Sequence, residues 1–209
     1  MRTARRRWDG GVGGLTVLKE LRRQLPNEST IYLGDEARMP YGEREASEVV
    51  AYTKQAMRWF SERECKLVVI ACNTATAAAL ETVRDEGRVP IIGVIRPGAS
   101  AAISATSGRA VGVLATRLTV RSGAYVRAIR DLDPFVDVLQ QPAPKLVPLI
   151  EAGGARSEEA REAVREYVTP MLSEGAVVAP GVDTLLLGLS LALVVRRRRV
   201  LVVGQGPRR

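Results

Sequence analysis

Short apolar runs recur along this chain, and stretches with helical spacing separate them. The runs at 66–71, 90–95 and 110–115 are apolar almost throughout, which is typical of strands in a parallel sheet covered on both faces. Further strands are expected at 30–33, 136–139 and 184–187. Helices are expected at 15–25, 45–64, 76–84, 99–106, 122–130 and 157–173, the last capped by Ser157. This alternation predicts an α/β fold with a mostly parallel sheet.

The alternation divides into two similar halves. We expect a boundary between Ile95 and Gly98, where Pro97-Gly98 would break the chain. The expected units are an N-terminal α/β domain at 1–95, a second α/β domain at 96–188 and an arginine-rich tail at 189–209. In such sheets ligands bind beyond the carboxyl ends of the strands.

The net charge of +8 comes from the two ends of the chain. Lys and Arg number 31 against 23 Asp and Glu, and ten of the basic residues lie in terminal clusters at 2–7, 196–199 and 208–209. The rest holds 21 basic and 23 acidic residues, so a basic face built into the fold is not expected. Aromatic residues make up 4 %, too few for base-stacking platforms.

Several functional classes are excluded by what the sequence lacks. Histidine is absent, which excludes a Ser-His-Asp triad and zinc bound by histidine. Cys65 and Cys72 are too few for a disulfide scaffold, so reduced thiols in the cytoplasm are expected. Asp9-Gly10-Gly11 follows the basic start in place of an apolar stretch, so a signal peptide is not expected. The most apolar stretch, 184–195, has twelve residues, whereas a membrane helix needs about 20.

Cys72 is the most suggestive single residue, because it stands between a buried strand and the start of a helix. Backbone N–H groups and the helix dipole there favour a thiolate, and Asn73 and Thr74 bring donors that could hold a carboxylate. A buried structural thiol is the alternative, and position alone does not decide between them. Tyr41-Gly42 and Thr116 also follow expected strands and could share this rim.

The remaining candidates are weaker when taken alone. The glycine-rich segment 10–14 could cradle an anion or form an ordinary tight turn, and it fits no dinucleotide or Walker pattern. Asp9 could cap that turn, or it could orient a thiol or an amine. Glu151 follows an apolar run and could be a solvated carboxylate.

Six ordered segments resemble motifs of the bacterial glutamate racemases, which are members of the aspartate/glutamate racemase family. They are 9–16, 32–42, 71–77, 93–99, 112–116 and 146–151, and 183–188 is similar to the approach to that family's second cysteine motif. The resemblance covers residues 9–188. Six motifs in order are far more specific than any one of them.

This resemblance implies two α/β domains that face each other across a cleft, with glutamate between them and neither cofactor nor metal. One thiolate removes the α-proton, and a second thiol on the opposite face of the α-carbon returns a proton. Such a site must stabilise carbanion-like charge and exclude water. The resemblance implies that Cys72 is the thiol that acts on the D-enantiomer. It implies that the Asp9 carboxylate assists. It implies substrate binding by Gly10, Tyr41, Gly42, Asn73, Thr74 and Thr116, with Glu151 in support.

The sequence departs from the family pattern at both ends. Leu189 stands where the second catalytic cysteine is expected, and Gly10 replaces a substrate-binding serine. Without the opposite base we expect loss of racemisation, although Cys72 could still exchange the α-proton of one enantiomer. Ser190 is a poor base unless a partner activates it. The match ends at a motif and an arginine-rich tail follows. This pattern is typical of a frameshift, and it predicts an incomplete second domain and C-terminal return.

The leading hypothesis is therefore a glutamate racemase that supplies D-glutamate for peptidoglycan in the cytoplasm. One alternative is a non-catalytic binding or regulatory protein of racemase descent, since some glutamate racemases inhibit DNA gyrase and arginine clusters favour acidic partners. Another is the related aspartate racemase. The family also includes homodimers, and no membrane partner is expected.

Overall fold

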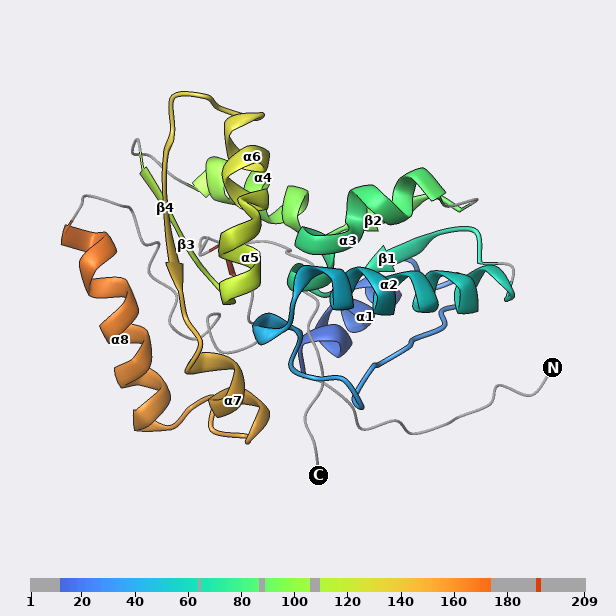
Figure 1. The fold of residues 1–209 in the computed structure, drawn as a ribbon, viewed down its shortest axis with the longest axis horizontal. Coiled ribbons are helices and arrows are strands. Elements are labelled where there is room, and N and C mark those ends of the chain that lie inside the picture. Colours follow the sequence, from blue (N-terminus) through green and yellow to red (C-terminus); the bar gives the residue numbers. More distant parts are fainter. Residues whose placement is uncertain (1–11, 64, 87–88, 106–109, 174–190, 193–209) are drawn as a thin grey trace.

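The computed structural model describes residues 12–63, 65–86, 89–105, 110–173 and 191–192 (Figure 1). The elements follow in this order: α1 (Val12–Gln24), η1 (Tyr41–Glu43), α2 (Ala46–Ser61), β1 (Val68–Ile70), α3 (Asn73–Glu86), β2 (Ile91–Gly93), α4 (Ile95–Ala105), β3 (Ala110–Ala115), α5 (Arg117–Ser122), α6 (Ala124–Arg130), β4 (Asp137–Pro142), α7 (Leu146–Glu151), α8 (Glu158–Ser173) and β5 (Leu191–Ala192). The predicted α/β fold is confirmed.

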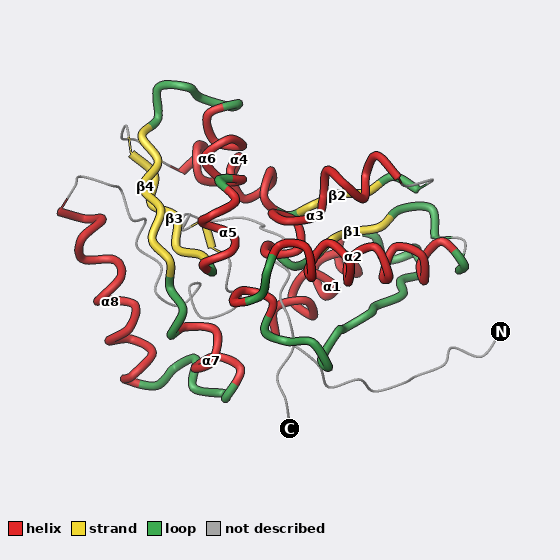
Figure 2. Tube along the Cα trace, viewed as in Figure 1, coloured by secondary structure: helices red, strands yellow, loops and turns green. Residues whose placement is uncertain are grey.

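The described strands form two separate sheets (Figure 2). In the first, β1 pairs in parallel with β2, and Val69 lies opposite Ile92. In the second, β3 is central: it pairs in parallel with β4 and antiparallel with β5. The antiparallel pairing of β5, in which Leu114 lies opposite Leu191, was not predicted.

Helices cover both faces of the first sheet. Val68 and Ile70 point into a cluster with side chains of α2 and α3, among them Val49 and Ala79. Val69 packs instead against Val17 of α1, because successive side chains of a strand point to opposite faces. The helix α2 begins with a capping box in which Glu45 and Glu48 each accept the other's backbone N–H.

The second sheet is covered on both faces as well, and all six residues of β3 are buried. Val111, Val113 and Ala115 pack against side chains of α4 and α6. Ala110 and Leu114 pack against side chains of α7 and α8. This burial explains the continuous apolar run that predicted the strand.

Two expectations about the backbone are wrong. Residues 30–33 are not a strand: they have no ladder partner among the described strands, and Ile31 is 50 % exposed. Pro97-Gly98 does not break the chain, because both residues lie in the first turn of α4. A helix tolerates proline there, since the N–H that proline lacks has no partner within the helix.

The other differences concern helix boundaries. The helix expected at 122–130 is α6, which follows Gly123 with its φ of 64°, and the helix α5 before that glycine was not predicted. The short helix α7 was not predicted. The cap at Ser157 is confirmed, because its Oγ accepts the Ala160 N–H at 3.1 Å. The strand expected at 184–187 lies outside the described residues, and the domain boundaries stay predictions.

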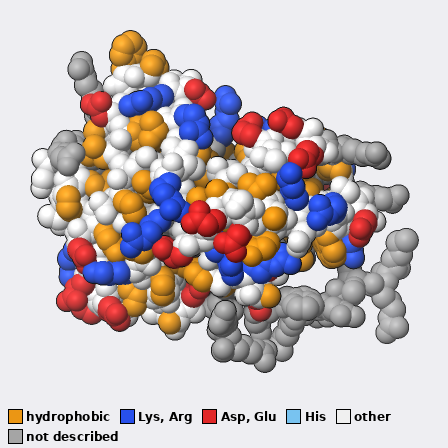
Figure 3. Space-filling model, in the orientation of Figure 1, with side chains coloured by type: hydrophobic (Ala, Val, Ile, Leu, Met, Phe, Trp, Pro, Cys, Tyr) orange, Lys and Arg blue, Asp and Glu red, His pale blue; other side chains and the backbone are white. Residues whose placement is uncertain are grey.

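The two halves meet where η1 and α3 pack against α5. The contact is close: a Cβ built at Gly42 would lie 2.5 Å from Cγ2 of Thr116, so only glycine fits there. On the face shown in Figure 3, Lys and Arg side chains are mixed with Asp and Glu. Ion pairs such as Arg117–Glu43 join side chains of opposite charge in the described structure. None of the helices in the described part of the chain has the length and apolar surface that a membrane crossing requires.

Candidate functional site

Cys72 lies at the junction between β1 and α3, one residue before the helix begins. Its Sγ accepts the backbone N–H of Ala75 at 3.4 Å, which is the bond that an N-cap side chain makes with the third residue of a helix. The side chain is half-buried, and no disulfide joins it to Cys65. The expected position of this thiol at a helix N-terminus is confirmed.

The helix start favours the thiolate of Cys72, but burial outweighs this effect. Burial raises the pKa of Cys72 above its ordinary value. The backbone N–H groups of Ala75 and Thr74 and the Thr74 hydroxyl lower this pKa, but their sum is smaller than the effect of burial. Cys72 is therefore a protonated thiol at neutral pH, and its donors stabilise the thiolate once it forms.

Thr116 holds the equivalent place at the junction between β3 and α5. Its Oγ1 accepts the Thr119 N–H at 3.3 Å and so caps α5. The same oxygen lies 3.0 Å from the hydroxyl oxygens of both Thr74 and Thr119, and all three side chains are buried. These hydroxyl groups satisfy one another across the contact between the two halves.

Asn73, the first residue of α3, makes a second link between the halves. Its Oδ1 accepts a hydrogen bond of 2.6 Å from the hydroxyl group of Tyr125, which lies in α6. Both side chains are almost fully buried, at 3 % exposure for Asn73 and 1 % for Tyr125. The orientation of the amide group is therefore fixed from the second half of the molecule.

Tyr41 approaches Cys72 from η1. Its hydroxyl group donates to the Asp35 carboxylate at 2.7 Å, and the Arg38 guanidinium lies 3.2 Å from the same carboxylate oxygen. Burial and the Asp35 carboxylate raise the pKa of Tyr41 far above its ordinary value, so this phenol stays protonated. Arg38 also stacks on the ring of Tyr52, 4.6 Å from its centroid.

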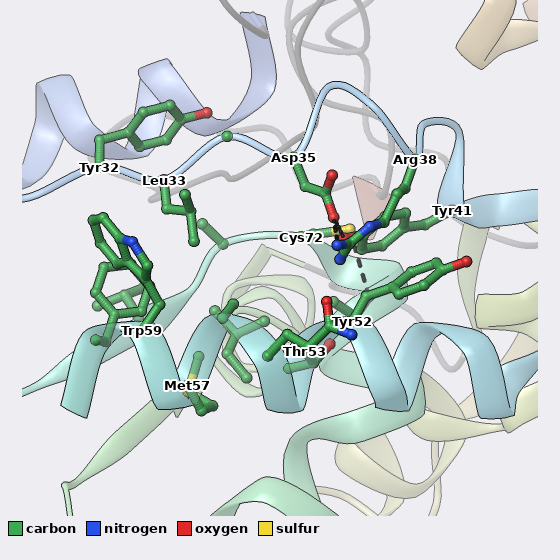
Figure 4. Close-up of a pocket in the computed structure, with 18 of the residues that line it drawn as sticks. Tyr32, Leu33, Asp35, Arg38, Tyr41, Tyr52, Thr53, Met57, Trp59 and Cys72 are labelled. Atoms are coloured by element: carbon green, nitrogen blue, oxygen red, sulfur yellow. Dashed lines mark hydrogen bonds and ion pairs between the residues drawn. The ribbon is translucent and has the colours of Figure 1, made fainter. Parts of the chain in front are cut away.

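A cavity of about 420 Å³ opens beside Cys72, between the segment 31–35, α2 and the end of β1. Figure 4 shows Cys72, Asp35, Arg38 and Tyr41 at one end of this cavity and Tyr32 and Trp59 at the other. Asn73, Thr74 and Thr116 do not line it. The thiol thus lies between an open cavity on one side and a buried group of amide and hydroxyl side chains on the other.

The structure brings together most of the predicted site residues that it describes. Cys72, Asn73, Thr74, Thr116, Tyr41 and Gly42 meet where η1, α3 and α5 pack together. Glu151 ends α7 and does not line the cavity. Asp9, Gly10 and Leu189 lie outside the described residues.

Four residues with clear contacts at this place were not predicted. Asp35 and Arg38 belong to a motif that the sequence did show, and an acidic and a basic residue just before Pro40-Tyr41 could have indicated their role. Thr119 and Tyr125 gave no signal, because their contacts join residues 45 and 52 positions apart. Within the described residues, no group of three His, Cys, Asp or Glu side chains could hold a metal ion.

Comparison with known proteins gives a consistent result. Residues 13–188 match the family model described as Asp/Glu/Hydantoin racemase. The chain is 45 % identical over 195 residues to the glutamate racemase of Microcystis aeruginosa, covering 91 % of this chain. It is 46 % identical over 180 residues to that of Streptococcus equi subsp. equi, covering 86 % of this chain.

Comparison with solved structures gives the same family as the sequence comparisons. Glutamate racemase RacE1 from Bacillus anthracis aligns with a TM-score of 0.73 and 38 % identity, covering 77 % of this chain and 60 % of that one. The Francisella tularensis enzyme in complex with D-glutamate aligns with a TM-score of 0.71 and 35 % identity, covering 76 % and 60 %. The chain covers 66 % of each of the two curated relatives, slightly less than two thirds of their length.

Proposed function

The chain belongs to the Asp/Glu/hydantoin racemase family, and from this premise we propose that Cys72 is a thiol acid/base that acts on the α-proton of glutamate. The observation that carries the proposal is the junction itself. A thiol stands at the N-terminus of α3, with the Ala75 N–H on its sulfur and the groups of Asn73, Thr74 and Thr116 beside it. Glutamate is the substrate proposed because the similar enzyme from Francisella tularensis binds D-glutamate.

The proton transfer needs no group beyond those of the site. The Cys72 thiolate takes the α-proton, the electron pair of the C–H bond stays on the α-carbon, and the thiol returns a proton to the same face. The α-proton is weakly acidic, so the site must stabilise the charge that develops on the substrate. The donors that stabilise the thiolate lower the cost of forming the base from a thiol whose pKa is raised.

The binding roles are proposed from the family resemblance. We assign the substrate carboxylates to the Asn73 amide, the Thr74 and Thr116 hydroxyl groups and the backbone at Gly42, with the Tyr41 phenol beside the thiol. Asp9 is assigned to assist the thiol or the substrate ammonium, Gly10 to the substrate, and Glu151 to a supporting place. These assignments are proposals, as are the two-domain division at 95/96 and the action without a cofactor.

The proposed reaction stops short of racemisation. Leu189 takes the sequence position of the family's second cysteine, so no thiol is available to protonate the opposite face. We therefore propose hydrogen exchange at the α-carbon of D-glutamate without inversion. Where the second base is present, such a reaction supplies D-glutamate for peptidoglycan.

The free thiols of Cys65 and Cys72 agree with a place in the cytoplasm. A homodimer and a DNA gyrase partner stay predictions.

The test is proton NMR of the folded protein with L- and D-glutamate, separately, in deuterated water. We expect the α-proton signal of D-glutamate to disappear without inversion and that of L-glutamate to persist. Replacing Cys72 by serine should lower the exchange rate by about a thousandfold or more, because a hydroxyl group is a far weaker acid than a thiol. The matched control is Cys65→Ser, which should keep the rate.

Two outcomes would contradict the proposal. Inversion of both enantiomers would show that a second base exists. Absence of exchange from a folded protein, or exchange that survives Cys72→Ser, would remove the thiol from the reaction.

A further inference from the structure

The Asn73 side chain is buried, and one of its two polar atoms has a hydrogen-bond partner. Its Oδ1 accepts the Tyr125 hydroxyl at 2.6 Å, whereas its Nδ2 makes no hydrogen bond to any residue that the structure describes. Among the described side chains, Gln140 Oε1 is the buried polar atom that lacks a partner, so Nδ2 of Asn73 keeps contact with solvent. A donor that reaches solvent beside Thr74 and Cys72, on an amide whose oxygen is already bonded, is available to an acceptor on a ligand.

We propose that Tyr125 is a positioning residue, which fixes the Asn73 amide so that Nδ2 faces a carboxylate of the bound amino acid. This inference rests on the proposed function, because that function supplies the carboxylate. With Oδ1 occupied by the tyrosine, the amide presents donors to the ligand. In the opposite orientation the amide would turn its oxygen towards a negatively charged group.

Tyr125 is well suited to hold one orientation. Its ring lies in the cluster around Val113 and Ile129, where a side chain with two rotatable bonds cannot move freely. Gly98 of α4 leaves the room that the hydroxyl group needs, because a Cβ there would lie 3.2 Å from the phenol oxygen. At 1 % exposure Tyr125 is too buried to touch a ligand, so it acts through Asn73.

This contact also gives the second half of the molecule a part in binding. Tyr125 lies in α6 and Asn73 in α3, and the hydrogen bond crosses the contact between the halves. A substrate carboxylate bound by Asn73 is thus held by a group whose direction depends on α6 and α4.

The experiment measures D-glutamate affinity by calorimetry for the full chain and its variants. Tyr125→Phe removes the hydroxyl group and keeps the ring, and we expect it to weaken binding about tenfold, the effect of one buried hydrogen bond. The matched control is Tyr167→Phe, because the hydroxyl group of this buried tyrosine bonds only to the Lys145 N–H in the described structure. That control should keep the affinity.

A double-mutant cycle separates positioning from a general structural effect. If Tyr125 acts through Asn73, Tyr125→Phe should cause no further loss of affinity in an Asn73→Ala background. A tenfold loss that persists in that background would overturn the proposal. So would an unchanged affinity of Tyr125→Phe.

A second readout does not depend on glutamate. In ¹⁵N relaxation of the side-chain amide of Asn73, the order parameter should fall in Tyr125→Phe and stay unchanged in Tyr167→Phe. If wild-type protein fails to bind D-glutamate, the proposed function fails, and this readout still tests whether Tyr125 fixes the amide. An unchanged order parameter would overturn the inference.

Discussion

The junctions β1–α3 and β3–α5 are built alike and differ in the atom that caps the helix. In each, a polar residue follows a buried strand and accepts the N–H of the residue three positions later, at 3.4 Å for Cys72 and 3.3 Å for Thr116. At the first junction the acceptor is the sulfur of a thiol, which can titrate, although burial raises its pKa. At the second it is a hydroxyl oxygen and cannot.

The difference shows that capping geometry and chemistry are separable. Either side chain can end its strand and begin its helix, so the fold requires only an acceptor at that place. The thiol adds a titratable group, and burial keeps that group protonated. The turn η1 touches both junctions, because Tyr41 faces Cys72 and Gly42 packs on Thr116. Substitutions that disturb one junction at a time can test this view.

The largest expected effect is that of Gly42→Ala. The new Cβ would lie 2.5 Å from Cγ2 and 2.6 Å from Cβ of Thr116, so the η1 turn must move away from α5. We expect the free energy of unfolding to fall by about 3 kcal/mol in urea titration. Gly34→Ala is the control, because its nearest contact is an ordinary 3.4 Å to Tyr32. Equal stability of the two variants would show that the junctions are not packed as described.

Thr116→Val should come next, with a loss of about 2 kcal/mol. The substitution keeps the shape but removes the N-cap acceptor and the partner that the Thr74 and Thr119 hydroxyl groups share, which leaves these two their longer contact of 3.4 Å with each other. Thr116→Ser restores the oxygen and should recover most of the loss. The same urea titrations measure it, and a valine variant as stable as the serine variant would contradict the role of the cap.

The smallest effect is that of Cys72→Ser on stability, below about 1 kcal/mol at pH 7, because serine also caps the helix. The pH dependence of the stability difference between this variant and the wild type is more informative. A thiol whose pKa is raised by folding holds its proton longer in the folded state than in the unfolded one. Its contribution to stability is therefore complete below the unfolded pKa of about 8.5 and is lost as the pH rises through the folded pKa.

Wild-type stability should thus decline more steeply above pH 8.5 than that of Cys72→Ser in urea titrations at successive pH values. Tyr32 and Tyr41, which face the thiol, also have raised pKa values, but they titrate at higher pH in both proteins and cancel in the comparison. Parallel curves for the two proteins would mean that folding does not shift the pKa of Cys72.

Much of the fold could be predicted from local pattern. β3 is buried on both faces, so its apolar run is unmistakable, and Ser157 has the acceptor that a helix start needs. The segment 30–33 has the same kind of pattern, but a strand also requires a neighbour, and sequence does not name one. The sequence predicts a break at Pro97, although position within the first turn decides whether a helix tolerates proline.

The site also contains residues that local sequence predicts and residues that only tertiary packing places there. Cys72, Asn73 and Thr74 could be predicted because they directly follow a recognisable strand. Tyr125 and Thr119 could not, because their partners come from another part of the chain through packing. The raised pKa of the thiol could not be predicted, since the helix start is visible in the sequence and the degree of burial is not.

The strand β3 has no residue that faces solvent, and its two faces belong to different clusters. Val111, Val113 and Ala115 must fit α4 and α6, while Ala110 and Leu114 must fit α7 and α8. The odd-numbered and even-numbered residues of β3 therefore pack independently of each other, although they share one backbone. A change on one face can be compensated by the helices of that face alone, so the two layers of this half are free to diverge separately while the strand between them keeps its register.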